Sequence, residues 1–598
     1  MNPNAAKDAN TSATATLPEW NLADLYPGPD SPELKADIDR LATESTRFRE
    51  AWQGRLAEID GKKFGQAVRE FEALTEITGR IMSYAQLLHA GNVSDPEVGR
   101  FYQTLQERIT DISTATLFFT LEVNRLSEDR MADLLKDPAA AHYEPWLRDL
   151  RAFREHQLDD EMERLLHELD VTGRSAWVRL FDETMADMRF PLGDENLTAT
   201  EIFDLMSSPD REKRAAAAAS IGKVLNSNKR LFSLITNTLA KDKATDDNWR
   251  NYARPVSARN LGNAVEDEVV DALATAVQDA YPRLSHRYYK IKAEWLGLDK
   301  LKHWDRNAPL PADDDRKIGW PEAADTVLSA YESFSPELSK IGKQFFDGGW
   351  IDAPARPGKA GGAFAHPTVP SAHPYILLNY QGKVRDVMTL AHELGHGVHQ
   401  VLAGPRGNLM ANTPLTLAET ASVFGEMLTF QSMLKKTQNP AKRKIMLAGK
   451  IEDMINTVVR QTAFYEFERR VHDERRSGEI ASERICEIWM DVQRESLGPV
   501  FDFTDDYGIY WSYIPHFIHS PFYVYAYAFG DCLVNALYDL FEQGHPKFQE
   551  KYLEMLSAGG TLRHKELLAP FGLDASDPAF WKRGLSVVER MIDQLEEL

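Results

Sequence analysis

One stretch limits the possible structures of this chain more than any other, and it runs from Leu390 to Gln400 as Leu-Ala-His-Glu-Leu-Gly-His-Gly-Val-His-Gln. His392, Glu393 and His396 within it form the pattern H-E-x-x-H, whose side chains can act together only if the stretch is helical. Asp386 is expected to open that helix, where a carboxylate suits exposed backbone N–H groups. Apolar residues recur at steps of three and four, which predicts a helix with one buried face: Val387, Leu390, Ala391, Leu394, Val398, Val401 and Leu402.

The pattern predicts a zinc site on this helix. His392 and His396 are about 40° apart around the helix axis and one turn apart along it, so both imidazoles can bind one ion. Glu393 projects from the same turn, the position of a general base that activates water. The alternative is a pair of core or capping histidines, but in a chain with 16 histidines in 598 residues the pattern is expected by chance only roughly a few hundredths of a time. We therefore favour the metal site.

A third protein ligand is expected, because hydrolytic zinc sites usually have three and leave the fourth position to water. Glu419 lies 419 − 396 = 23 residues after the second histidine, where a returning helix can present it. Thr416 and Glu419 also match a capping box, which is a structural use of the same carboxylate. Glu426 and His399 are the competing ligands. The residues alone leave these alternatives open.

Length and composition predict a soluble cytoplasmic protein of at least two lobes. A chain of 598 residues exceeds the size at which one hydrophobic core stops growing, and it has no run of eighteen apolar residues to span a membrane. Its only cysteines are Cys486 and Cys532, which suits a reducing compartment. A formal charge of −22 disfavours nucleic acid as a partner.

The chain as a whole has a predominantly helical pattern. Met188 to Leu197 predicts a β-hairpin, and we expect a boundary near residue 200. The predicted division is a flexible tail over 1–18, an N-terminal helical lobe over 19–200 and a catalytic domain over 201–598. Apolar residues at helical spacing predict helices over 32–57, 64–91, 95–125, 127–136, 158–186, 198–243 and 265–296.

Two short segments before the predicted zinc helix favour β-structure. Pro374 to Tyr380 is β-prone and bounded by Pro and Gly, so it is a strand candidate, and the segment around Gly361 could pair with it. Gly361 and Gly362 permit close approach of another backbone, as in a substrate that adds a strand to the sheet. A simple glycine turn without a ligand is the alternative.

An aromatic cluster near the C-terminus is the last candidate site. Ser520 followed by Pro521 predicts a helix start, and the helix is expected to run to about Gln543 before Gly544. His516 precedes it, and Tyr523, Tyr525 and Tyr527 would lie in its first two turns. Such groups can stabilise the oxyanion formed during peptide hydrolysis, although an ordinary aromatic core is the alternative.

Taken together, these motifs resemble the thimet-type zinc oligopeptidases, and specifically the oligoendopeptidase F branch. The resemblance covers nearly the whole chain and rests on several separated motifs in the same order. They are Trp20-Asn-Leu-Ala-Asp-Leu-Tyr-Pro, Gly361-Gly-Ala-Phe, Leu390-Ala-His-Glu-Leu-Gly-His-Gly-Val-His, Glu419-Thr-Ala-Ser-Val-Phe-Gly-Glu426, His516 with Pro521-Phe-Tyr-Val-Tyr, and Phe580-Trp-Lys-Arg-Gly-Leu.

The resemblance implies a mostly α-helical fold of two lobes around a deep substrate channel, with a small β-sheet beside the zinc helix. It implies one Zn²⁺ per chain bound by His392, His396 and Glu419, with Glu393 as the base. The implied activity is hydrolysis of internal peptide bonds in short unstructured oligopeptides. A carboxypeptidase-like exopeptidase and a non-catalytic peptide-binding protein are the alternatives.

The resemblance also implies residues that contact the substrate. His516, Tyr523 and Tyr525 would bind substrate or stabilise the transition state, with Tyr525 favoured over Tyr523 as the oxyanion donor. The implied substrate-binding residues are Gly361, Gly362, Ala363, Phe364 and Tyr527. The oligomeric state is not predicted.

Overall fold

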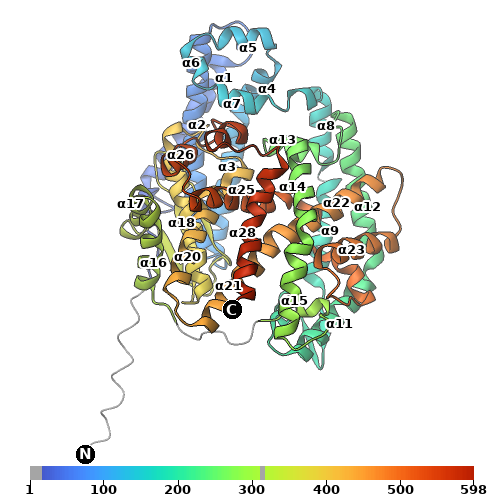
Figure 1. Cartoon of the computed structure of the whole chain (residues 1–598). Coiled ribbons are helices and arrows are strands. Elements are labelled where there is room, and N and C mark those ends of the chain that lie inside the picture. The colour runs from blue at the N-terminus through green and yellow to red at the C-terminus, as the bar shows by residue number, and fades with distance from the viewer. Residues whose placement is uncertain (1–16, 171, 310–316) are drawn as a thin grey trace, which may run out of the picture. The chain divides into compact units, whose positions relative to one another are not determined.

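The computed structural model (Figure 1) describes residues 17–170, 172–309 and 317–598. Contacts within the chain divide it into two compact helical units. Unit 1 consists of residues 1–154, 315–436 and 544–572, and unit 2 consists of residues 155–314, 437–543 and 573–598. The chain thus alternates between the units, whereas the sequence analysis expected one boundary near residue 200. Residues 1–16 of the predicted tail lie outside the described residues, and the carbonyl of Pro18 accepts a hydrogen bond from Ala353.

Unit 1 contains a small sheet among its helices. Its helices are α1 (Pro32–Trp52), α2 (Gly61–Gly91), α3 (Pro96–Ser113), α4 (Leu117–Arg125), α5 (Glu128–Leu134), α6 (Pro138–Ala141), α7 (Glu144–Arg151), α16 (Trp320–Phe334), α17 (Pro336–Asp347), α18 (Val384–Ala403), α19 (Leu415–Ala418), α20 (Thr420–Lys436), α26 (Phe548–Leu556) and α27 (His564–Leu568). The predicted N-terminal helices are confirmed, and the predicted helix over 95–125 is interrupted near Thr114.

The sheet of unit 1 has the strand order β3-β5-β4, with β3 (Ile351–Pro354), β4 (Phe364–His366) and β5 (Tyr375–Tyr380). The predicted strand before the zinc helix is confirmed as β5, and its predicted pairing with the preceding segment is confirmed by antiparallel β4, which places Phe364 opposite Leu377. Strand β3, which pairs with β5 in parallel, was not predicted. Since β4 is the last strand on its side, one of its edges is not paired within this sheet.

Unit 2 is also helical and carries the predicted hairpin, formed by β1 (Phe190–Leu192) and β2 (Glu195–Leu197). Its helices are α8 (Asp160–Asp170), α9 (Arg174–Asp187), α10 (Ala199–Asp204), α11 (Arg211–Ser227), α12 (Lys229–Trp249), α13 (Ser257–Gly262), α14 (Asp267–Ala280), α15 (Ser285–Trp295), α21 (Pro440–Ile455), α22 (Gln461–Arg475), α23 (Ser482–Leu497), α24 (His516–His519), α25 (Tyr525–Glu542) and α28 (Pro578–Glu596). The long helices α25 and α28 pack against each other.

The helix predicted to start at Ser520 starts later. Ser520 ends the short helix α24, and α25 begins at Tyr525. Phe522 between them has a φ of 60°, a left-handed conformation that a helix cannot contain. The predicted end is confirmed, because α25 stops at Glu542 shortly before Gly544. In the part of the chain that the structure describes, no helix is long and apolar enough to cross a membrane.

Candidate metal centre and associated residues

The predicted zinc helix is α18, and its apolar stripe is buried. Val387, Leu390, Leu394 and Val398 are fully enclosed. The sequence analysis expected Asp386 to open this helix, but the helix already starts at Val384. The Asp386 carboxylate still accepts hydrogen bonds from the backbone N–H groups before the helix, at 2.8 Å from Gln381 and 3.0 Å from Lys383.

Helices α18 and α20 pack closely because glycines lie where they meet (Figure 1). A Cβ atom on Gly395 of α18 would lie 2.5 Å from the carbonyl oxygen of Ala421 and 2.6 Å from the Cα atom of Ser422. Tyr331 of α16 fills the space that a side chain on Gly425 would need, and its hydroxyl donates to the carbonyl of Ala391 at 2.6 Å. This close packing brings the start of α20 next to the histidines of α18.

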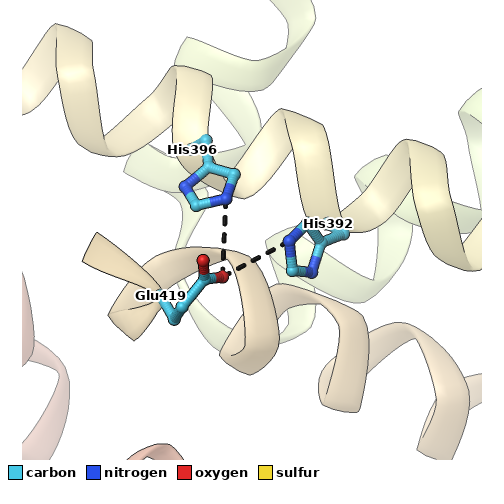
Figure 2. Close-up of side chains that lie close together, drawn as sticks. All are labelled: His392, His396 and Glu419. Atoms are coloured by element: carbon cyan, nitrogen blue, oxygen red, sulfur yellow. Dashed lines mark ion pairs between the residues drawn. The ribbon is translucent and has the colours of Figure 1, made fainter. Parts of the chain in front are cut away.

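His392, His396 and Glu419 form a cluster that matches a metal site (Figure 2). One ligand atom from each residue lies within 4.8 Å of the other two. Glu419 Oε2 is 3.3 Å from His392 Nε2 and 3.5 Å from His396 Nε2. The hydroxyl of Ser422 donates to the same carboxylate oxygen at 2.7 Å and helps to orient it. Two imidazoles and one carboxylate are a donor set that suits zinc.

Glu419 does not cap a helix, and the two competing ligands lie outside the cluster. Glu419 lies between α19 and α20, and Pro414 rather than Thr416 precedes α19, so the predicted capping box is wrong. Glu426 lies beside the other ring nitrogen of His392, with its Oε2 atom 3.3 Å from Nδ1. His399 is buried, and its Nε2 is 3.3 Å from the hydroxyl oxygen of Thr413. Neither Glu426 nor His399 therefore belongs to the cluster.

Glu393 is a buried carboxyl group next to the cluster. Only 7% of its surface is exposed, and burial raises its pKa to about 7, although the charge of His392 opposes this shift. The backbone N–H of Ala365 on β4 also acts on the carboxylate and lowers the pKa. Strand β4 packs against α18, which carries the candidate base, and the sequence analysis did not foresee this proximity because no local pattern indicates it.

The glycine segment before β4 is held open. A Cβ atom on Gly361 or Gly362 would meet no atom within 4 Å, and Gly362 has a φ of +77°. The Asn379 side chain of β5 donates to the carbonyls of Ala360 and Gly362 at 3.0 and 2.8 Å. The segment is therefore fixed in shape, with space beside the glycines.

The predicted aromatic residues lie in unit 2 and fall into two groups. The rings of His516, Tyr523 and Tyr527 cluster, with centroids 5.4 to 6.1 Å apart, and all three are partly exposed. Tyr525 is only 1% exposed, and its hydroxyl accepts a hydrogen bond from Asn263 at 2.8 Å. Tyr525 thus differs from the other three residues because its side chain is buried.

Side chains of unit 2 that the sequence analysis missed hold the loop between α24 and α25. Arg174 donates to the carbonyls of Ile518 and His519, each at 3.0 Å. Arg259 donates to the carbonyl of Pro521 at 3.2 Å, and Glu468 accepts from the N–H of Phe522 at 2.8 Å. These residues are distant in sequence from the loop, so no spacing rule could have indicated them.

The fold and the cluster together define a helical metallopeptidase. Residues 204–587 match the model of peptidase family M3, and residues 122–190 match a second model described as oligopeptidase F. The chain belongs to peptidase family M3, whose members are metallopeptidases that hydrolyse oligopeptides. The resemblance inferred from the sequence motifs and the predicted mostly helical fold are confirmed.

Curated relatives agree with this assignment, and solved structures share the fold. The chain is 28% identical to oligopeptidase PepF of Bacillus subtilis over 603 residues, which cover 97% of this chain and 87% of the relative. It is 25% identical to the plasmid-encoded oligoendopeptidase F of Lactococcus lactis subsp. cremoris, with 97% of both chains covered. The fold matches a peptidase structure from Chlamydophila abortus with a TM-score of 0.86 at 24% identity, covering 97% of this chain and 98% of the other. It also matches oligoendopeptidase-F from Enterococcus faecium with a TM-score of 0.71 at 24% identity, covering 94% and 98%.

Proposed function

We propose that this protein is a zinc-dependent endopeptidase that cleaves internal bonds of short, unstructured oligopeptides. The observation that carries the proposal is the convergence of His392, His396 and Glu419 on one point beside the buried carboxyl group of Glu393. We infer a cytoplasmic location, which the two free cysteines, Cys486 and Cys532, support.

The residues around the cluster suit one Zn²⁺ per chain. A bound zinc ion would polarise the scissile carbonyl and lower the pKa of a water molecule. Glu426 holds His392 in the orientation that points Nε2 at the cluster, as carboxylates behind zinc-binding histidines commonly do. Glu393 takes the proton of the attacking water and delivers it to the leaving amine.

The substrate is proposed to bind as an added strand at the free edge of β4. Such pairing uses main-chain hydrogen bonds, so affinity depends little on the peptide's side chains. Gly361 and Gly362 leave room for the peptide backbone, and Ala363 and Phe364 continue the binding segment. The packing of β4 against α18 brings this strand close to the base.

Tyr523 is our preferred donor to the oxyanion, with His516 and Tyr527 as neighbouring substrate contacts. A donor to a substrate must be accessible, and these three side chains are partly exposed. Tyr525, which the sequence analysis favoured, is buried and already hydrogen-bonded within unit 2. The family resemblance supports a catalytic role for this group as a whole.

The proposal is tested by metal analysis combined with cleavage of end-blocked peptides. Glu393→Gln should retain about one zinc ion per chain while kcat falls by roughly two orders of magnitude or more, because a general base is lost but no ligand. Glu426→Gln is the matched control outside the cluster and should weaken zinc binding by about 10- to 100-fold, less than Glu419→Gln does. Loss of zinc from Glu393→Gln would contradict the assigned role.

End-blocked substrates distinguish the proposed endopeptidase from an exopeptidase and from a non-catalytic peptide-binding protein. An endopeptidase cleaves a peptide whose termini are both blocked, whereas an exopeptidase does not. A binding protein without activity would retain the peptide uncut, and the presence of Glu393 argues against it. Mass spectrometry of the products gives the positions of the cleaved bonds.

A further inference from the structure

Unit 2 contains a small internal cavity that no part of the proposed reaction uses. It has a volume of about 10 Å³, space for one water-sized occupant. Its polar lining comes from four separate segments of unit 2 and consists of Tyr289, Arg306, Asn456, Arg460, Gln493 and Ser496. We propose that this cavity is a binding site for a small monovalent anion, of which a halide ion is the probe.

Among the described residues, the two arginines of the cavity have no carboxylate partner of their own. Neither Arg306 nor Arg460 forms an ion pair with a carboxylate among the residues that the structure describes. Glu452, whose charge acts on Arg306, already accepts hydrogen bonds from Lys292 at 2.8 Å and from Tyr288 at 2.6 Å. Lys292 and Arg306 therefore share the charge of one carboxylate. Buried charges are normally paired, so a negative charge is missing from this region.

Two side chains of the cavity also have N–H groups for which the described residues offer no hydrogen-bond acceptor. Arg460 Nε and Gln493 Nε2 are both buried and have no acceptor in the described part of the chain. Gln493 is only 2% exposed, and its other amide atom, Oε1, accepts a hydrogen bond from the Tyr507 hydroxyl at 2.9 Å. Two side chains that line one cavity thus each carry a buried N–H donor without an acceptor, which favours an occupant that accepts hydrogen bonds over a cation.

The local backbone explains how Arg460 reaches the cavity. Residues Asn456–Arg460 form one turn of π-helix between α21 and α22, and such turns are often found at functional sites. The guanidinium group then packs 4.9 Å from the ring centre of Phe464. The side chain is held on one face by this ring, which leaves its N–H edge for the cavity.

The size of the cavity restricts the anion. One water-sized space does not admit phosphate or sulfate, whereas a monatomic halide is the anion that comes nearest to water in size. Two guanidinium groups and one amide supply enough donors for such an ion. The inference does not depend on peptidase activity, since the metal cluster belongs to unit 1 and the cavity to unit 2.

The test is the melting temperature of the full-length chain in chloride or bromide compared with gluconate at equal ionic strength. Gluconate is too large to enter, so halide should raise Tm by roughly 2 °C through preferential binding to the folded state. Arg460→Gln should abolish this difference. Arg494→Gln is the matched control, because Arg494 follows Gln493 on α23 but has a side chain that is 60% exposed, and this variant should keep the full difference.

A second variant supplies the missing charge. Gln493→Glu keeps an acceptor for Tyr507 and places a carboxylate beside the two arginines, so its Tm should no longer depend on halide. Crystals soaked in bromide should show one anomalous peak in the wild-type cavity and none in this variant. Equal Tm in all salts without a bromide peak would mean that the cavity holds water only and would overturn the proposal. A shift with acetate or formate but not with halide would also overturn it, in favour of a carboxylate ligand.

Discussion

At the scale of single residues, His392 shows how a candidate metal ligand is held on both sides. Its Nε2 faces Glu419 of the cluster, while its Nδ1 faces Glu426. Both carboxylates come from the segment that starts α20, seven residues or two helical turns apart. Glu419 lies on the cluster side of the imidazole and Glu426 on the other side, which gives the two carboxylates different roles. Spacing along the chain does not show on which side each carboxylate lies.

Tyr523 and Tyr525 should respond differently to loss of the phenolic oxygen. Tyr523→Phe is expected to lower kcat by about 10²- to 10³-fold with little change in KM, since the lost bond acts in the transition state. Tyr525→Phe should instead lower stability by about 1 kcal/mol, because Asn263 loses an acceptor in the core. Steady-state kinetics and thermal unfolding of both variants make the comparison, and the opposite pattern would restore Tyr525 as the oxyanion donor.

Glu468 should make stability depend on pH. Burial raises its pKa to about 8, although Phe522 N–H, Arg259 and Lys243 oppose the shift. A folded-state pKa above the ordinary value of 4.5 means that the folded state holds the proton longer, so stability is lost as pH rises from about 4.5 to 8. Glu468→Gln keeps a neutral acceptor and should remove this loss, which amounts to roughly 5 kcal/mol at most.

Urea unfolding of the wild type and Glu468→Gln between pH 5 and pH 9 measures this effect. Glu487→Gln is a suitable control, because its side chain is 64% exposed and its charge stays in water in both states. Parallel stability curves for the wild type and Glu468→Gln would show that the buried carboxyl group does not titrate in this range.

At the scale of elements, the metal centre depends on how closely α18 and α20 approach each other. Gly395→Ala places a methyl group against the backbone of Ala421 and Ser422, which cannot rotate away. The variant should lose about 1–3 kcal/mol of stability and bind zinc more weakly, because Glu419 is pushed from the histidines. Gly449→Ala is the matched control on α21, where a Cβ atom meets nothing within 4 Å.

The control should be as stable as the wild type, or more stable by about 0.5–1 kcal/mol, since alanine favours helix. Measurements of zinc affinity and urea unfolding on both variants test whether the contact between α18 and α20 controls zinc binding. Unchanged zinc binding in Gly395→Ala would mean that the position of Glu419 does not depend on the contact between these helices.

At the scale of the whole molecule, the form of the substrate should matter more than its sequence. A peptide that adds a strand to β4 must present an extended backbone with free hydrogen-bonding groups. A segment inside a folded domain can do so only by unfolding locally, at a cost of up to roughly 5–15 kcal/mol. We expect cleavage of an end-blocked peptide of about ten residues and none of the same segment inside a rigid domain. Equal rates at equal concentration would indicate a general protease.

The sequence by itself determined the features that depend on local geometry. The helix that carries His392, Glu393 and His396 follows from residue spacing, because four residues make about one helical turn. Strand β5 and the hairpin of β1 and β2 follow from short β-prone runs bounded by turn residues. The mostly helical fold and the family follow from patterns of this kind repeated along the chain.

Only the tertiary structure decided which distant residues meet. It placed Glu419 on the histidines and Glu426 behind one of them, buried Tyr525 while leaving Tyr523 accessible, and added the parallel strand β3. It also joined separate stretches of the chain into each unit and enclosed Arg306 with Arg460 around one cavity. These outcomes depend on packing between elements far apart in sequence, such as the contact at Gly395, and such packing leaves no periodic signal along the chain.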